Sequence, residues 1–343
     1  MNGSAVPPDV RPVDPLLGDW CDRHLGSRAI EQFFGVQHLS AVHGVRLADG
    51  REVVLKVRGA LDRQAACAAV HEAMWWAGIP CPRPLAGPAP LAEGDLAVLS
   101  GGGAGYGLAD ASLLAVNAET WEGEGVAAVG AIGAAGYGRM LARMVAAAPA
   151  IAALTTLDPP VPWLHWDHRH PARVWPPAAS DRWDPHRIDD EIDPMVHEVA
   201  RRARARLLAS DVATLPRVAA HGDFEAQNCR WVQGGDGQPR LVIHDWDSVV
   251  AMPEAVLAGN SAFQYNSVVD CAITTMAQND DFLSAYVAER GRTWTEQEWQ
   301  VAHAAGAWVG AYNAAFEHLK GGPGPVTAGL RDQAQWRLAR AGA

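Results

Sequence analysis

Two stretches near the N-terminus alternate apolar and polar residues on either side of a short polar turn. The sequence LSAVHGVRLADGREVVLKVRG occupies residues 39–59, and its alternation has the two-residue period of half-buried β-strands. Asp49-Gly50 at its centre is a strong signal for a hairpin turn. The pattern therefore predicts antiparallel strands near 41–47 and 52–58.

Helical periodicity surrounds this hairpin. Residues 20–34 are predicted to form an amphipathic helix, and residues 63–79 form a second one that ends at glycine with prolines beyond. A buried strand is expected over 95–100, followed by a glycine-rich linker. The small sheet-plus-helix unit is therefore expected to span residues 20–101, preceded by a loose tail over residues 1–19.

The remaining residues, 102–343, are mostly helical in pattern, with a strand-loop-strand region over 219–250. A Pro- and Trp-rich segment at 158–187 is either an ordered loop on the substrate side or a surface excursion held by its tryptophans. Helices are expected at 126–149, 190–210, over most of 255–318, and at 328–340. The expected fold class is α+β, with a small antiparallel-sheet lobe and a larger helical lobe.

Composition narrows the functional class. The chain has 343 residues, of which 49% are hydrophobic, enough to bury a sizeable core. Its formal net charge of -11 disfavours a nucleic-acid partner, which would require a basic surface. No window is apolar over the roughly 18 residues of a membrane span, and the N-terminal residues do not resemble a secretion signal. Five cysteines without metal-ligand spacing fit a reduced, cytoplasmic protein.

The charges are distributed unevenly. Residues 20–105 contain 8 basic and 8 acidic residues, whereas residues 106–343 contain 19 basic and 28 acidic ones. Among 28 lysines and arginines, only Lys56 and Lys320 are lysines. In such a chain, a lysine indicates a position where arginine does not serve.

The strand-loop-strand region carries the residues suited to chemistry. HGDFEAQN, residues 221–228, places Asp223 and Asn228 in one loop, and LVIHDWDS, residues 241–248, ends an apolar strand at Asp245. Strand ends bring side chains together, so Asn228 and Asp245 can share a Mg²⁺ ion through oxygen ligands. Asp223 would then face whatever the metal holds.

Phosphoryl transfer requires such a set. A metal neutralises the phosphates, a carboxylate orients and deprotonates the attacking hydroxyl, and a separate cation holds the nucleotide. Lys56 lies on the strand after the hairpin, and Glu72 lies sixteen residues later on the predicted helix. In two-lobed kinases a strand lysine paired with a helix glutamate reaches the α- and β-phosphates.

At these residues the sequence resembles the aminoglycoside phosphotransferase-like kinases, relatives of the choline and fructosamine kinases with a protein-kinase-like fold. The resemblance covers about residues 35–255 and rests on HGDFEAQN, IHDWDS and VVLK with Glu72. It implies that Asp223 is the catalytic base and that His221 buttresses the loop. It also implies Asn228 and Asp245 as Mg²⁺ ligands, and Lys56 with Glu72 as contacts to ATP.

Three positions depart from the family pattern. GVQHLS, residues 35–40, lacks the repeated glycines of a nucleotide-covering loop, which leaves Ser40 as the candidate phosphate contact. Glu225 stands where the family often has histidine; it could repel phosphate or bind a cationic acceptor. Asp247 could cap a turn or contact substrate or metal.

The leading hypothesis is an ATP- and Mg²⁺-dependent kinase that phosphorylates a hydroxyl of a small polar molecule. The acidic larger lobe favours a cationic acceptor, such as an amino sugar, an aminoglycoside or another antibiotic, or an amino alcohol. The alternative is a catalytically silent nucleotide-binding module on the same fold. A metal-dependent hydrolase fits less well, because paired His-Asp ligands are lacking. The identity of the acceptor and the oligomeric state do not follow from the sequence.

Overall fold

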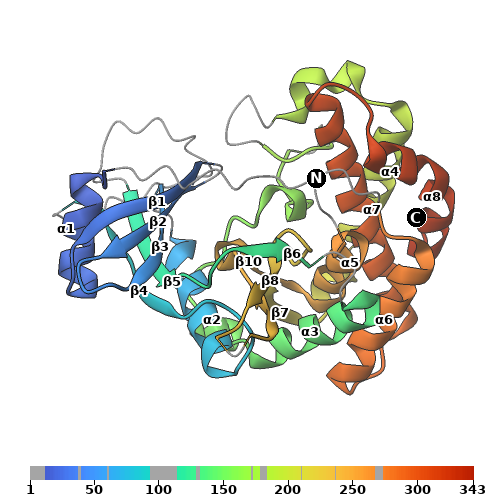
Figure 1. Cartoon of the computed structure of the whole chain (residues 1–343). Helices are drawn as coiled ribbons and strands as arrows, with labels where there is room; N and C mark the ends of the chain where they lie inside the picture. The colour runs from blue at the N-terminus through green and yellow to red at the C-terminus, as the bar shows by residue number, and fades with distance from the viewer. Residues whose placement is uncertain are drawn as a thin grey trace, which may run out of the picture.

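A computed structural model describes most of the chain. The described residues are 12–37, 40–59, 62–92, 114–128, 132–170, 173–177, 184–209, 211–235, 237–266 and 273–343. Figure 1 shows two lobes, one at the left that contains a sheet and one at the right that is built mainly of helices. None of the described helices is long and apolar enough to span a membrane.

The smaller lobe, here called the N-lobe, contains a five-stranded antiparallel sheet in the order β1-β2-β3-β5-β4. Two helices accompany it, α1 (Pro15–Leu25) and α2 (Arg63–Trp76). The strands are β1 (Ala29–Gln37), β2 (Ala41–Leu47), β3 (Glu52–Gly59), β4 (Pro84–Pro90) and β5 (Leu114–Thr120).

Alternation along the strands separates the two faces of this sheet. Leu55 and Val57 of β3 pack with Trp20 of α1 in one buried apolar cluster. Lys56 and Arg58 alternate with Leu55 and Val57 along β3, so their side chains point to the opposite face of the sheet. That face is turned toward the larger lobe, where both side chains make ion pairs described below.

The larger lobe, here called the C-lobe, is built mainly of helices. These are α3 (Gly133–Ala147), α4 (Pro194–Leu207), α5 (Glu254–Gln264), α6 (Met276–Arg290), α7 (Glu296–Leu319) and α8 (Pro325–Ala341). Short 3-10 turns lie between α3 and β7, notably at Pro162–Leu164 and Pro185–Glu191. Helices α5 and α7 pack so closely that a Cβ atom at Gly259 would collide with the backbone of Ala302.

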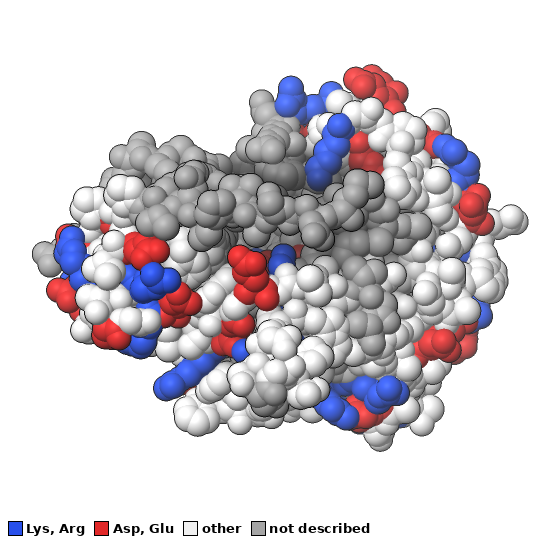
Figure 2. Space-filling view, in the orientation of Figure 1, with Lys and Arg blue, Asp and Glu red and all other residues white. Residues whose placement is uncertain are grey.

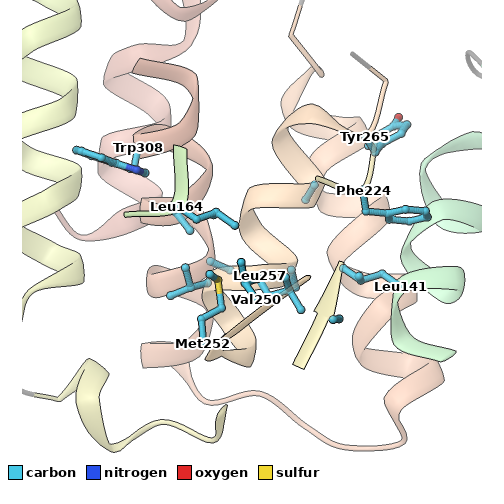
Figure 3. Close-up of a cluster of buried hydrophobic side chains, with 14 of the residues drawn as sticks. Leu141, Leu164, Phe224, Val250, Met252, Leu257, Tyr265 and Trp308 are labelled. Carbon is cyan, nitrogen blue, oxygen red and sulfur yellow. The ribbon is translucent and has the colours of Figure 1, made fainter. Parts of the chain in front are cut away.

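Two small sheets in the C-lobe hold the motif region. Strand β7 (Arg217–His221) pairs with β10 (Val249–Pro253), and β8 (Cys229–Gln233) lies between β6 (Gly125–Ala127) and β9 (Pro239–Ile243). A buried apolar cluster lies against them, with Phe224 of the motif loop near Leu141 and Val250 near Leu257 in Figure 3. The motif loop is therefore anchored to the main core.

The predicted α+β, two-lobed fold is confirmed, as are the hairpin strands and the helices at 63–79, 190–210 and 328–340 within a few residues. Other boundaries were wrong. The helix predicted over 20–34 ends at Leu25, and the β1 strand follows from Ala29. The tail predicted over 1–19 overlaps α1, which begins at Pro15.

The predicted lobe boundary at residue 101 also needs correction. Strand β5 (Leu114–Thr120) pairs with β3 and β4, so the N-lobe sheet takes in residues beyond the expected linker. The strand predicted over 95–100 lies outside the described residues. The sequence did not indicate β5 as a sheet strand, because the glycine-rich stretch before it resembled the end of the unit.

Candidate active site

The catalytic-loop candidate runs from the end of β7 to the start of β8. Asn228 Nδ2 donates to Asp223 Oδ2 over 2.9 Å and to the backbone oxygen of Asp223 over 2.8 Å. These two bonds close the loop into a tight turn and fix the orientation of the Asp223 carboxylate. Asp223 and Asn228, which the sequence places five residues apart in one loop, are thus in direct contact.

His221 connects this loop to the metal-segment candidate, residues 244–248. Its Nε2 lies 2.7 Å from the backbone oxygen of His244, which can only accept, so Nε2 carries the proton. Its Nδ1 accepts from the backbone N–H of Asp223 over 3.1 Å and lies 3.1 Å from Ser248 Oγ. Burial lowers the pKa of His221 to about 4, which keeps the ring neutral and this pattern intact. These contacts are those of a residue that buttresses the loop.

Gly222 explains why the motif needs glycine after histidine. A Cβ atom there would lie 2.7 Å from the backbone oxygen of Ser248. The backbone oxygen of Gly222 accepts from Trp163 Nε1 and from Asn260 Nδ2, each over 3.2 Å. The loop is consequently held from the irregular segment and from α5 as well as from its own strand.

Asp245 occupies a strained backbone position. Its φ of 67° and ψ of 45° are left-handed, and among the described residues it is the one non-glycine with positive φ. Such a conformation costs on the order of 1 kcal/mol and is typical of functional turns. The turn leaves the Asp245 side chain 42% exposed, with Oδ1 4.0 Å from Lys56 Nζ.

The carboxyl groups of Asp223, Asp245 and Asp247 lie close enough that negative charge on all three is unfavourable. Burial, opposed by the Asn228 hydrogen bond and reinforced by Asp247, raises the pKa of Asp223 to about 6. Burial and the nearby Asp247 also raise the pKa of Asp245 well above its usual value. A cation placed between these groups would relieve their mutual repulsion.

Lys56 does not contact Glu72. Its Nζ lies 3.3 Å from Oε1 of Glu119 on β5, and both side chains are less than a tenth exposed. Glu72 lies on α2 with an exposed side chain, so the pairing expected from the sequence is wrong. The spacing of sixteen residues was correct for a helix after β3, but the inward-facing position on that helix belongs to the preceding residue, His71.

Asp247 makes an ion pair with Arg58 of β3. Burial alone would raise the pKa of Asp247, but the Arg58 guanidinium holds it well below its usual value. The side chain is therefore an anion already matched by a cation of the N-lobe. None of the three roles considered from the sequence, which were turn capping, contact with a substrate and contact with a metal, includes this ion pair.

Glu225 is buried, at 8% exposure, and Gln227 Nε2 donates to its Oε1 over 2.6 Å. Burial and the neighbouring Asp223 raise its pKa well above the usual value, which favours the neutral acid. Glu225 is thus not the exposed anion that was expected to attract a cationic acceptor.

The comparisons agree with this architecture. A spectinomycin phosphotransferase solved with ADP and spectinomycin superposes with a TM-score of 0.55 at 11% identity, covering 95% of this chain and 100% of its own. An amicoumacin kinase solved with AMP-PNP, Ca²⁺ and its ligand Ami gives a TM-score of 0.52 at 12% identity, covering 90% and 88%. This chain has the aminoglycoside phosphotransferase-like fold. No protein-family model matches the sequence, and no curated protein matches it significantly.

The residues expected from the sequence to contact a nucleotide come from both lobes. Ser40 is buried immediately before β2, but residues 38 and 39 of the expected covering loop lie outside the described residues. Lys56 and Arg58 project from β3 toward the metal segment, where Lys56 lies near Asp245 and Arg58 pairs with Asp247. The side chains expected at a phosphate site thus converge from both lobes.

The residues present fit a divalent cation. Both hydrogen bonds of the Asn228 amide use Nδ2, so its Oδ1 is not occupied by them. Asp245 contributes a half-exposed carboxylate. Amide and carboxylate oxygens are the ligands that Mg²⁺ prefers, and two protein ligands are typical where phosphates supply others.

Sequence reasoning missed two residues of this candidate site, Glu119 and Arg58. A signal existed for each. Arg58 shares the alternation of β3 with Lys56, and Glu119 shares the alternation of β5 with Asn117. A charged residue within a strand that is otherwise buried points to a buried partner.

Proposed function

We propose that this protein is an ATP-dependent phosphotransferase that moves the γ-phosphoryl group to a hydroxyl of a small, polar, cationic molecule in the cytoplasm. The observation that carries the proposal is the convergence of three elements. The Asp223–Asn228 pair is closed by a 2.9 Å hydrogen bond, Asp245 sits on a strained turn, and Lys56 lies 4.0 Å from Asp245. The fold shared with small-molecule kinases supports it.

In this proposal Asp223 is the catalytic base. Its carboxylate is oriented by the hydrogen bond from Asn228, and its backbone N–H is held by His221. One carboxylate oxygen can then accept the proton of the acceptor hydroxyl. A base with a pKa near neutrality is suited to proton transfer at physiological pH, and the pKa of Asp223 is raised to about 6. Positioning by this rigid loop would align the hydroxyl for attack.

The remaining roles concern the nucleotide. Lys56 would contact phosphate oxygens, as a compact ammonium on a buried strand can. Asn228 and Asp245 would hold Mg²⁺, which when bound neutralises phosphate charge. Ser40, immediately before β2, is proposed as a further phosphate contact.

The cationic nature of the acceptor rests on the excess of acidic residues in 106–343. Several of these acids are already paired: Asp193 with Arg331 and Asp280 with Arg340. On the face shown in Figure 2, acidic side chains are scattered among basic ones and do not form one patch. The two structures named above contain spectinomycin and Ami, which supports an antibiotic-like acceptor without identifying it.

The test is a screen of ATP consumption and thermal shift over amino sugars, aminoglycosides, amino alcohols and peptide antibiotics, with Mg²⁺ present. The expected result is acceptor-dependent ADP release, which Asp223→Asn lowers by about 10²–10⁴-fold. Nucleotide-induced stabilisation without turnover on any acceptor would favour the silent nucleotide-binding module. Absence of any nucleotide effect would contradict both.

A further inference from the structure

Glu119 and Lys56 are brought together by the sheet itself. In the β3–β5 ladder Lys56 lies opposite Asn117, and Glu119 is two residues further along β5. Residues two apart on a strand share a face, so Glu119 projects to the same side as Lys56. The 3.3 Å ion pair is buried, with side-chain exposures of 7% and 3%. Backbone pairing of adjacent strands therefore fixes this contact.

Buried side chains of helix α2 contact residues of the C-lobe. His71 is its buried residue at this level, with Nε2 2.8 Å from the backbone oxygen of Pro82 and its ring stacked on Trp246 at 5.5 Å and 9°. Cys67 Sγ donates to the backbone oxygen of Asp247, and Arg63 Nη2 donates to that of Val249. Helix α2 thus holds the metal segment, while its glutamate, Glu72, is exposed.

We propose that Glu119 is the positioning residue that orients Lys56 toward the nucleotide phosphates, in place of a glutamate on the helix. This inference rests on the proposed function. Because both partners belong to one sheet, displacement of α2 does not separate them. Movement of α2 would act instead on the metal segment, through Trp246 and the backbone of Asp247.

The charges around Lys56 explain why Glu119 matters. A buried ammonium requires an anion nearby, and the carboxyl groups that pair with Lys56 are Glu119 at 3.3 Å and Asp245 at 4.0 Å, while Asp247, which pairs with Arg58, adds a further negative charge. Glu119 holds the ammonium on the side of the sheet. Without it, Lys56 would turn toward Asp245 and occupy the carboxylate that is proposed to hold the metal.

The test compares Glu119→Gln with Glu72→Gln, which removes the same charge from the residue that the sequence suggested. Binding of Mg²⁺-ADP and of adenosine is measured by calorimetry for both variants and the wild type. Glu119→Gln is expected to lose about 10- to 100-fold in Mg²⁺-ADP affinity, the range for disrupting hydrogen bonds to charged groups. Adenosine affinity should be unchanged, because adenosine lacks the phosphates that Lys56 would contact. Glu72→Gln should match the wild type.

Comparing the two ligands separates positioning from general damage to the fold. An equal loss of adenosine and Mg²⁺-ADP affinity in Glu119→Gln, or no loss of either, would overturn the inference and leave the proposed function standing. A selective loss of Mg²⁺-ADP affinity in Glu72→Gln would also overturn it, and this arm remains decisive if Glu119→Gln fails to fold. Wild-type protein that binds no Mg²⁺-ADP would contradict the proposed function itself.

Discussion

The two halves of the candidate site are held by different kinds of interaction. In the C-lobe half, Asp223 is fixed by a hydrogen bond from the neutral Asn228 side chain to its carboxylate and by the bond that its own backbone N–H donates to the neutral His221 ring. In the N-lobe half, Lys56 and Arg58 are fixed by buried or nearly buried ion pairs with Glu119 and Asp247. Loss of a neutral hydrogen bond costs about 1 kcal/mol, whereas loss of one partner of a buried ion pair leaves an uncompensated charge.

Because of this difference, substitutions in the two halves should have different effects on the protein. The C-lobe loop can lose the charge of Asp223 without leaving a partner stranded, because Asn228 also bonds to the backbone of the same residue. The N-lobe half cannot lose Asp247 or Arg58 singly without burying a lone charge. We therefore expect substitutions in the first half to change turnover and those in the second half to change stability or nucleotide binding.

The largest expected effect is on turnover. Asp223→Asn should lower kcat by about 10²–10⁴-fold, the contribution of a general base, because the amide cannot accept the hydroxyl proton. Mg²⁺-ADP affinity and the urea midpoint should stay near those of the wild type. The measurement is steady-state kinetics on the acceptor found in the screen, alongside calorimetry. Turnover near the wild-type rate would show that this loop does not supply the base.

The next effect is on stability. Arg58→Met leaves Asp247 without its cation, and breaking a buried pair on one side costs about 3–5 kcal/mol of unfolding free energy. The double variant Arg58→Met/Asp247→Asn removes both charges and should recover most of that loss. Urea denaturation of the single and double variants measures the difference. A double variant as unstable as the single one would show that the ion pair is not the source.

The catalytic loop was predictable because its partners are close in sequence. Asp223 and Asn228 lie within one loop, and glycine, histidine and strand signals surround them, so residue types and spacing indicated this loop as the site, although not the hydrogen bond between the two side chains. The partner of Lys56 was not predictable in the same way. Glu119 follows a glycine-rich stretch that obscured β5, and only the sheet order places β5 beside β3. Spacing along the chain suggested Glu72, but the phase of helix α2 turns that side chain outward.

A third effect concerns the shape of the cation. Lys56→Arg keeps the charge but replaces a compact ammonium by a wide planar group, which does not fit between Glu119 and Asp245 in a buried site. The affinity for Mg²⁺-ATP, and with it turnover at low ATP concentration, should fall by about 10-fold or more, since even 1.4 kcal/mol of lost phosphate contact gives that factor. Lys320→Arg, at the end of α7, is the matched control and should be silent. Equal tolerance at both positions would make Lys56 an ordinary strand residue.

The smallest effect is a dependence of stability on pH that arises from buried neutral histidines. Burial, partly opposed by Asp280, lowers the pKa of His303 on α7 to about 4, from 6.5. Between these values the unfolded chain binds a proton that the folded chain does not, so the free energy of unfolding falls as the pH falls below about 6.5. For one histidine the loss is about 1.4 kcal/mol per pH unit at most within this window.

His303→Gln should therefore show a smaller loss of stability than the wild type between pH 7 and pH 5.5, by about 1 kcal/mol in urea denaturation. His221 has the same lowered pKa and should keep a neutral imidazole signal in NMR titration down to about pH 5. The Arg58–Asp247 pair stays charged throughout, because the pKa of Asp247 is held low, so it contributes no slope over this range. Identical pH profiles for wild type and His303→Gln would show that burial does not hold this histidine neutral.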